Sequence, residues 1–174
     1  MGVLTPAEDS LRSLIDKSRN IVFFGGAGMS TESGIPDFRG AHGLYNQTGG
    51  KSYEEMLSIR FLLDHPDELW AVYRKVMLHP DAKPNAGHYA LARLEKRGKL
   101  KAVVTQNIDG LHQDAGSQKV IELHGTVRRN LCMACGTVHD LKYALLQQGT
   151  PRCECGGVLR PNIVFYGEPL DTQV

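Results

Sequence analysis

Short, largely apolar runs alternate along the chain with helix-like patterns. The runs at 21–24, 100–105 and 120–123 are rich in β-branched or aromatic residues, which is typical of buried strands. Apolar residues before the first run follow the spacing of an amphipathic helix, and 86–96 also has a helical pattern. Strands that alternate with helices predict an α/β fold with a parallel sheet of the doubly wound kind.

The segment 46–84 looks helical and is punctuated by Pro66 and Pro80. Its apolar positions are expected to form a packed helical face rather than a cofactor-binding stripe. They are Met56, Leu57, Phe61, Leu62, Leu69, Trp70, Tyr73 and Met77.

Charge and hydropathy exclude several classes of protein. The chain has 174 residues with 20 basic and 19 acidic side chains, so a nucleic-acid partner is not indicated. No apolar run approaches the 18 or so residues of a membrane span, and we expect no membrane partner. The first 20 residues show no pattern of a secretory signal, so a cytoplasmic location is expected.

Glycines directly follow the first predicted strand. Gly25, Gly26 and Gly28 would let the backbone approach a phosphate closely, with the N–H groups of a following helix facing the anion. The pattern differs from the dehydrogenase fingerprint, because Thr31 occupies the position of its third glycine, and no Gly-Lys-Ser/Thr marks a P-loop. The glycines alone leave two interpretations open: a nucleotide-phosphate loop, or an ordinary turn from strand to helix.

Polar side chains follow the other two predicted strands. Gln106, Asn107 and Asp109 come directly after 100–105, and His124 comes directly after 120–123. Ligands of such sheets bind outside the carboxyl ends of the strands. Each of these residues could by itself be a turn or capping residue, but together they favour a site for a sugar-phosphate ligand. A neutral imidazole at His124 could accept a proton near pH 7.

All four cysteines fall into two close pairs, Cys132-x-x-Cys135 and Cys153-x-Cys155, with 17 residues between the pairs. Without a secretion signal, thiolate ligation is favoured over disulfides, and four thiolates predict one structural zinc ion. The second pair encloses a single residue, Glu154, and so has less turn to donate N–H groups to sulfur. A weakened or redox-sensitive site remains the alternative.

Four stretches in order resemble the sirtuins, which are NAD-dependent protein deacylases. They read GAGMSTESGIPDFRG at 26–40, TQNIDGLH at 105–112, ELHG at 122–125 and RPNIVFYGE at 160–168, with the cysteines between the last two. The resemblance covers nearly the whole chain, from about 21 to 170. Family members usually have two residues inside the second cysteine pair.

The resemblance implies an NAD-dependent protein-lysine deacetylase, which transfers the acetyl group to ADP-ribose and releases nicotinamide. His124 matches the histidine that deprotonates a ribose hydroxyl, and Asn107 and Asp109 match positions that organise the ribose and the nicotinamide. His124 and Asn107 are therefore the expected catalytic residues. The expected NAD-contacting residues are Gly26, Ala27, Gly28, Thr31, Phe38, Arg39, Gln106, Asn107, Ile108, Asp109 and His124.

The resemblance also implies the acyl substrate and how it binds. In the family, extended backbone after the Arg-Pro-Asn stretch pairs with an acetylated substrate peptide by strand addition. An internal core strand that uses Ile163 and Phe165 is the alternative. The expected substrate-binding residues are Val164, Phe165, Tyr166 and Gly167.

A neutral acyl group such as acetyl is favoured over a succinyl-type acid. The acid-binding subclass has a tyrosine and an arginine three residues apart in the helical insertion, whereas Tyr73 is followed by Val76 at that spacing. The six other histidines are expected to be surface or structural residues, namely His42, His65, His79, His88, His112 and His139.

The expected fold is therefore α/β, a Rossmann-like parallel sheet that is incomplete at the C-terminus. The Rossmann-like domain is assigned to 1–45, 85–128 and 159–174, the helical insertion to 46–84, and the zinc-binding module to 129–158. Family members continue into a second half of the sheet with a Gly-Thr-Ser loop and the adenosine contacts.

The sequence ends at Val174, so it is expected to be either a fragment of a longer protein or a truncated chain that is inactive by itself and binds NAD weakly. A non-catalytic module that binds NAD or ADP-ribose is the alternative function.

Overall fold

The computed structural model describes residues 5–38, 40, 43 and 52–172. Three parallel strands form one sheet in the order β1-β2-β3. Their bounds are Ile21–Gly25 for β1, Leu100–Thr105 for β2 and Val120–Glu122 for β3. The three predicted strands therefore form, and the parallel α/β sheet is confirmed.

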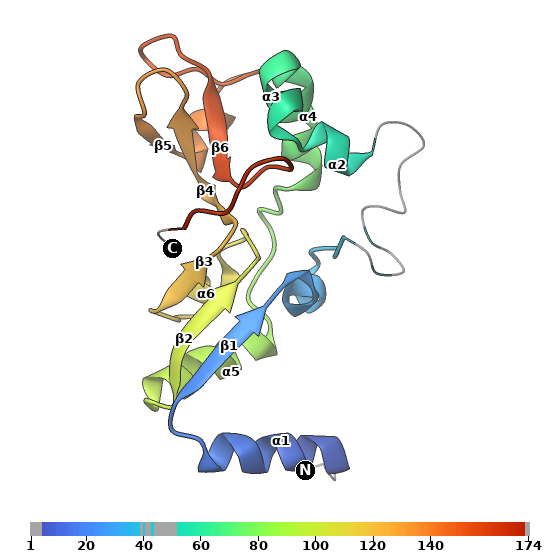
Figure 1. Ribbon diagram of the computed structural model, residues 1–174, viewed down its shortest axis with the longest axis vertical. Helices are drawn as coiled ribbons and strands as arrows, with labels where there is room; N and C mark the ends of the chain where they lie inside the picture. Colours follow the sequence, from blue (N-terminus) through green and yellow to red (C-terminus); the bar gives the residue numbers. More distant parts are fainter. Residues whose placement is uncertain (1–4, 39, 41–42, 44–51, 173–174) are drawn as a thin grey trace.

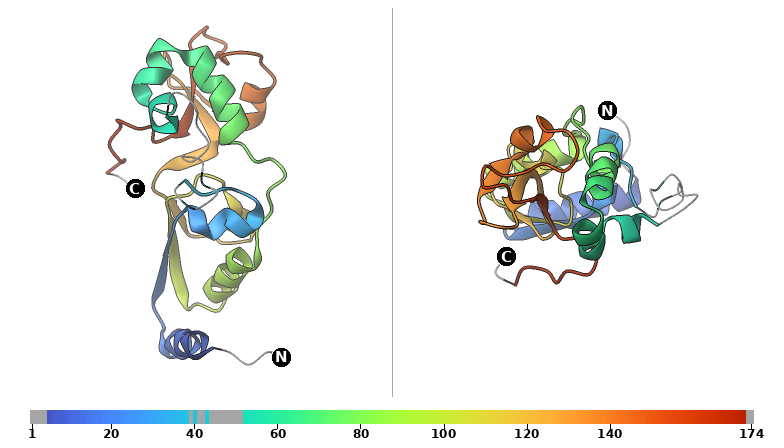
Figure 2. Two further views of the ribbon diagram at one scale, coloured as in Figure 1. Left: turned by 90° about the vertical axis from the view of Figure 1, so that its right-hand side faces the viewer. Right: turned by 90° about the horizontal axis from the view of Figure 1, so that it is seen from above.

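Helices flank this sheet (Figures 1 and 2). The helix α1, Pro6–Lys17, begins with a capping box between Thr5 and Glu8 and lies at the far end of the molecule. A short 3-10 helix, η1 (Ala27–Ser33), follows β1. The helix α5 (Ala86–Lys96) precedes β2 in the chain and packs on it, and the short helix α6 (Leu111–Asp114) comes after β2. None of the helices in the described part of the chain has the length and apolar character that a membrane-spanning helix needs.

A second sheet is antiparallel, with the order β5-β4-β6. Its strands are β4 (Gly125–Cys132), β5 (Val138–Asp140) and β6 (Leu159–Ile163), and α7 (Leu141–Leu145) follows β5. The strand β6 thus pairs with β4 and not with the parallel sheet. This sheet carries all four cysteines on or beside its strands.

Between η1 and α5, the described residues 52–85 form three helices: α2 (Tyr53–Met56), α3 (Ile59–Asp64) and α4 (Pro66–Val76). They lie beside the antiparallel sheet at one end of the molecule (Figure 1). Leu57, Phe61, Leu62, Leu69, Trp70 and Tyr73 are buried, and Met56 and Met77 pack against the same cluster. The predicted packed helical face is confirmed.

The helices and the antiparallel sheet share one hydrophobic core. Trp70 is fully buried, its indole Nε1–H donates to the carbonyl oxygen of Leu159 at 3.0 Å, and Tyr73 packs edge-on against it. Burying an indole without a partner for its N–H would be costly, so this hydrogen bond joins α4 to β6 specifically. The same core includes Ile163 and Phe165, which places the start of the RPNIVFYGE stretch inside it.

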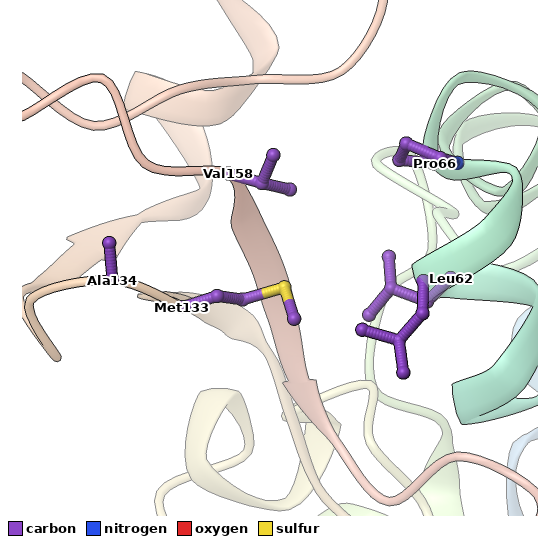
Figure 3. A pocket seen from close by; sticks show the side chains of 6 residues that line it. Leu62, Pro66, Met133, Ala134 and Val158 are labelled. Atoms are coloured by element: carbon purple, nitrogen blue, oxygen red, sulfur yellow. The ribbon is translucent and has the colours of Figure 1, made fainter.

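An apolar pocket of about 290 Å³ opens between α3 and the cysteine-bearing loops (Figure 3). Met133 reaches across it towards Leu62, and Val158 lies above (Figure 3). Leu63, Pro66 and Ala134 complete the lining, so none of the residues expected to bind NAD or to act in catalysis contributes to it.

Candidate functional site

The three parallel strands end at the same edge of the sheet. Gly25 is paired with Thr105, and Thr105 is paired with Glu122. The loops after all three strands therefore begin side by side, where open α/β sheets bind their ligands. The predicted polar residues at this edge come together for that reason.

Gly26 has extended backbone and directly precedes η1. An added Cβ at Gly26 would lie 3.1 Å from the Gln106 side-chain oxygen, so the loops after β1 and β2 lie close together here. Gly28 is exposed, and the Thr31 hydroxyl donates to the Gly28 carbonyl at 3.0 Å. The helix after the glycines is a short 3-10 helix instead of a regular α-helix. Phe38 is half-buried, Ala27 begins η1, and Arg39 lies outside the described residues.

Ser30 joins the first two loops. Its hydroxyl donates to the Asp109 carboxylate at 2.7 Å and accepts from the Asn107 side-chain amide at 3.0 Å. Ser30 is 1% exposed and Asn107 is 9% exposed, so both bonds are shielded from water. Asp109 also accepts from the backbone N–H of Leu111 at 2.9 Å, which leaves its carboxylate held from both sides.

A layer of buried polar side chains supports this triad from behind. The Asn85 side-chain amide donates to the Met29 carbonyl at 2.8 Å and to the Ser33 hydroxyl at 3.1 Å, which fixes η1. His88, one turn on, and His112 are both fully buried with ring centroids 4.7 Å apart. Both histidines are structural, as expected, although their proximity to the predicted NAD-contacting loops was not foreseen.

This histidine pair predicts an acid-sensitive fold. Burial, followed by the neighbouring His88, lowers the pKa of His112 to about 4, and Asp109 opposes the shift. The unfolded ring would bind its proton near pH 6.5, so between pH 6.5 and 4 the unfolded state holds more protons than the native state. The free energy of unfolding should therefore decrease as the pH is lowered from about 6.5 to about 4, by as much as about 3 kcal/mol.

Urea unfolding at several pH values between 7.5 and 4.5 measures this slope. The variant His112→Gln cannot titrate, so its stability should depend less on pH than that of the wild type. Equal slopes for the two proteins would contradict the assignment.

His124 lies half-buried just beyond β3, and its Nδ1 is 3.0 Å from the carbonyl oxygen of Gln106. A carbonyl only accepts, so Nδ1 carries the proton and Nε2 of the neutral ring keeps its lone pair. That tautomer is the one that a proton acceptor at Nε2 requires. The His124 carbonyl in turn accepts from the Val164 backbone N–H at 3.0 Å.

The residue after His124 has to be glycine. Gly125 has a φ of +75°, and an added Cβ would collide with the carbonyl oxygen of Asn162. The sharp turn into β4 at Gly125 thus sets where His124 sits relative to the start of the 164–167 segment.

The predicted substrate-binding segment lies just beyond the end of β6. Phe165 is buried in the core, and the Tyr166 backbone pairs with residues 57–59, accepting from Ile59 N–H at 3.0 Å and donating to the Leu57 carbonyl at 3.1 Å. The regular strand ends at Ile163, and both Ile163 and Phe165 are buried in the core, as the alternative of a core strand expects. Glu168 holds the following turn by a bidentate ion pair with Arg160, at 2.6 and 2.7 Å.

Ile108 differs from its neighbours in the same loop. Its side chain packs against the shared core of α3, α4 and the antiparallel sheet, and its carbonyl accepts from Val127 N–H at 2.9 Å.

The four cysteine sulfurs gather in one place, all within 4.8 Å of one another. Pairs that the structure brings close are Cys132 and Cys155 at 3.5 Å, Cys135 and Cys153 at 3.7 Å, and Cys135 and Cys155 at 3.4 Å. These are too long for disulfides, and the cysteines are free. A tetrahedron of sulfurs about 2.3 Å from a central zinc ion has edges of about 3.8 Å, so the cluster fits a structural zinc site.

Local turns build the cluster. The Cys132 carbonyl accepts from Gly136 N–H, and the Cys153 carbonyl accepts from Gly156 N–H, so each pair sits on its own tight turn. The Thr137 hydroxyl, 3.2 Å from the Cys135 sulfur, and the Thr137 backbone lower the pKa of the Cys135 thiol to about 6, whereas the neighbouring thiols raise the pKa of the Cys155 thiol. The gathering of the four sulfurs, and not the pKa of one thiol, indicates the metal site.

Comparison with known proteins places the chain among enzymes. The model of the Sir2 family matches residues 26–174. An NAD-dependent protein deacetylase of Cutibacterium acnes is 54% identical over 167 residues, covering 95% of this chain and 68% of that protein. One of Clostridium perfringens is 52% identical over 169 residues, covering 95% of this chain and 69% of that protein.

Solved structures agree with these matches. A Sir2 structure with a deacetylated p53 peptide and 3′-O-acetyl ADP ribose has a TM-score of 0.85 and 41% identity, covering 95% of this chain and 68% of that one. A Sir2 structure with a p53 peptide and NAD⁺ has a TM-score of 0.81 and 42% identity, covering 94% of this chain and 66% of that one. The chain belongs to the Sir2 family, the sirtuins, and it has the family's Rossmann-like fold.

Sequence reasoning left Ser30 out of the candidate residues. It lies inside the matched loop sequence, and a hydroxyl just after a strand and a glycine turn was the available signal. Its buried bonds to Asn107 and Asp109 appear only in the tertiary structure.

Proposed function

We infer that this protein is an NAD-dependent protein-lysine deacetylase in which His124 is the general base. NAD dependence and deacetylation rest on the family and on the named relatives. The single observation that supports the role of His124 is its contact with the Gln106 carbonyl, which leaves Nε2 free to accept a proton. A non-catalytic NAD- or ADP-ribose-binding module is not favoured, because curated relatives of high identity are deacetylases.

NAD binds along the shared edge of β1, β2 and β3 in this proposal. The diphosphate lies over the turn at 26–28 and Thr31, where glycine keeps the backbone open, and Phe38 covers the nicotinamide end. Arg39, which lies outside the described residues, is a further proposed NAD contact. Gln106, Ile108 and Asp109 continue the contact from the loop after β2. Asn107 and Asp109, held by Ser30, orient the ribose and the carboxamide.

With NAD bound, the acetyl oxygen of the substrate would displace nicotinamide from the ribose, and His124 would then accept at Nε2 the proton of a ribose hydroxyl. The hydroxyl oxygen would bond to the acetyl carbon, and with addition of water the bond from that carbon to the lysine nitrogen would break and release the lysine amine. The substrate is an acetylated lysine in a protein or peptide. The proposed substrate-binding segment is Val164, Phe165, Tyr166 and Gly167, and its first residue donates a backbone N–H bond to the His124 carbonyl. Solved relatives with p53 peptides support a peptide substrate.

Three further assignments are part of the proposal. A Rossmann-like domain is proposed for 1–45, 85–128 and 159–174, with a helical insertion at 46–84 and a zinc-binding module at 129–158. The strand β6, at the start of 159–174, nevertheless pairs with β4 of the antiparallel sheet. One zinc ion would be held by the four cysteines, Cys132, Cys135, Cys153 and Cys155. The ion would cross-link their two turns, and its four thiolate ligands would leave no open coordination position for catalysis. Four reduced thiols suit the cytoplasm, where we place the protein without a nucleic-acid or membrane partner; fractionation of cells tests that location.

Removing the Ser30 hydroxyl tests the proposed site apart from its base. We expect Ser30→Ala to lower kcat/KM for an acetylated peptide by about 10- to 100-fold, because Asn107 and Asp109 lose their common partner and a displacement of about 1 Å can cost that much. Steady-state kinetics with varied NAD measures the change. The matched control is Ser18→Ala, whose hydroxyl bonds only to the Leu14 carbonyl on α1; equal activity of all three proteins would contradict the role of Ser30.

A further inference from the structure

His139 lies against the cysteine cluster, although it is not one of the four sulfur ligands. Its Nε2 is 3.2 Å from the sulfur of Cys153. The residue sits in the middle of β5, opposite Asn130 of β4, so its backbone is fixed by the antiparallel sheet. An imidazole held this way meets the sulfur in a defined direction.

The ring is also held from its flat side. Asp140 caps α7 by accepting from Tyr143 N–H at 2.7 Å, and this turn brings Tyr143 back over His139. The two rings are stacked, with centroids 4.1 Å apart and planes 25° from parallel. The stack restricts rotation of the imidazole.

The direction of the hydrogen bond follows from the chemistry of the cluster. A thiolate that binds zinc can only accept, so Nε2 of His139 carries the proton and donates it towards Cys153. In the first pair, Cys132 sulfur accepts from Cys135 N–H at 3.5 Å, and Cys135 sulfur is 3.2 Å from the Thr137 hydroxyl. Cys153 belongs to the short Cys-x-Cys pair, and Nε2 of His139 lies at hydrogen-bond distance from its sulfur.

We propose that His139 is a positioning residue of the zinc site, which donates an N–H bond to the Cys153 thiolate and compensates for the shortened second cysteine pair. The bond fixes the orientation of the sulfur and stabilises its negative charge, and the stack with Tyr143 holds the imidazole in place. The inference goes beyond the deacetylase function and does not depend on it.

Zinc release tests the proposal without any measurement of catalysis. In the purified protein, His139→Phe keeps an aromatic ring for the stack and removes the donor. We expect one zinc per chain in this variant, but about 10-fold faster transfer of zinc to an excess of chelator, the lower end of the usual effect of losing a partner of a metal ligand. His139→Gln offers an amide N–H at a similar reach and should restore much of the retention.

Cobalt substitution supplies a readout that a purely structural role would not change. Co²⁺ in the wild type should give a four-thiolate spectrum, and loss of the N–H donor in His139→Phe should move the sulfur-to-cobalt charge-transfer band to lower energy. The matched control is His65→Phe, which removes an imidazole from the exposed start of α4. It should change neither the spectrum nor the release rate.

Three results would overturn the proposal. The first is an equal rate of zinc release for the wild type and His139→Phe. The second is a His139→Gln variant that releases zinc as fast as His139→Phe, and the third is a wild-type cobalt spectrum that shows a nitrogen ligand. If His139→Phe fails to fold, the glutamine variant and the wild-type spectrum still decide the matter. If the wild-type protein bound no metal at all, the zinc site itself, and with it the role of His139, would be rejected. Deacetylase activity is not measured in this experiment.

Discussion

His124→Ala should lower deacetylation of an acetylated peptide by at least about 100-fold, the lower limit for loss of a general base. The reason is that Nδ1 of His124 is engaged by the Gln106 carbonyl, which leaves Nε2 as the proton acceptor. The other described histidines nearest this edge, His88 and His112, are fully buried and cannot substitute. The measurement is kcat/KM with NAD in excess, on purified protein carrying this chain.

Two comparisons make this experiment specific. Exchange of labelled nicotinamide into NAD should suffer less than deacetylation, because in the proposed sequence the base acts after nicotinamide leaves. An unchanged thermal unfolding midpoint would show that the fold of the variant is intact. A loss below about tenfold is too small for a general base, and the role of His124 would then be wrong.

Cys155→Ala should weaken zinc binding by more than about 100-fold, because it removes a sulfur itself, and even partners of ligands contribute 10- to 100-fold. The variant should also unfold at a Tm about 10 °C lower or more, since loss of roughly 4 kcal/mol of metal-linked stability at about 3 °C per kcal/mol gives this shift. The unfolding should centre on the loops that carry the two cysteine pairs, which are held by short turns and by few strand pairs of their own.

Metal analysis and thermal unfolding, each with and without chelator, test this expectation. Glu154→Gln is the matched control, because Glu154 is exposed between the two cysteines and contributes no sulfur. Its zinc content and Tm should equal those of the wild type. Well under one zinc per wild-type chain, or full zinc content in Cys155→Ala, would contradict the assignment.

Much of the fold could be predicted because its elements are short-range patterns. The three parallel strands are runs of β-branched and aromatic residues that end in glycine or polar residues, and each formed at the expected place. The apolar residues of 46–84 repeat at helical spacing and are buried together. Cysteine spacing likewise indicated one cluster, because two close pairs can reach one metal ion.

Side-chain partners could not be predicted, because they join residues far apart in the chain. Ser30 and Asp109 are 79 positions apart, and only the alignment of β1 and β2 brings their loops within hydrogen-bond distance. For the same reason, the pairing of β6 with β4 and the shared core around Trp70 were not visible in the residues themselves.

The sequence by itself determined the chemistry that is available here: a glycine turn, an amide and a carboxylate, one histidine after the third strand, and four thiols. Residue types and local spacing are enough for that. The tertiary structure alone decided which atoms are free to act. It engages Nδ1 of His124 with a carbonyl and leaves Nε2 free, buries His88 and His112 behind Asp109, and turns His139 towards the Cys153 sulfur. Such choices depend on directions between distant segments, and these are set only when the sheets and loops pack.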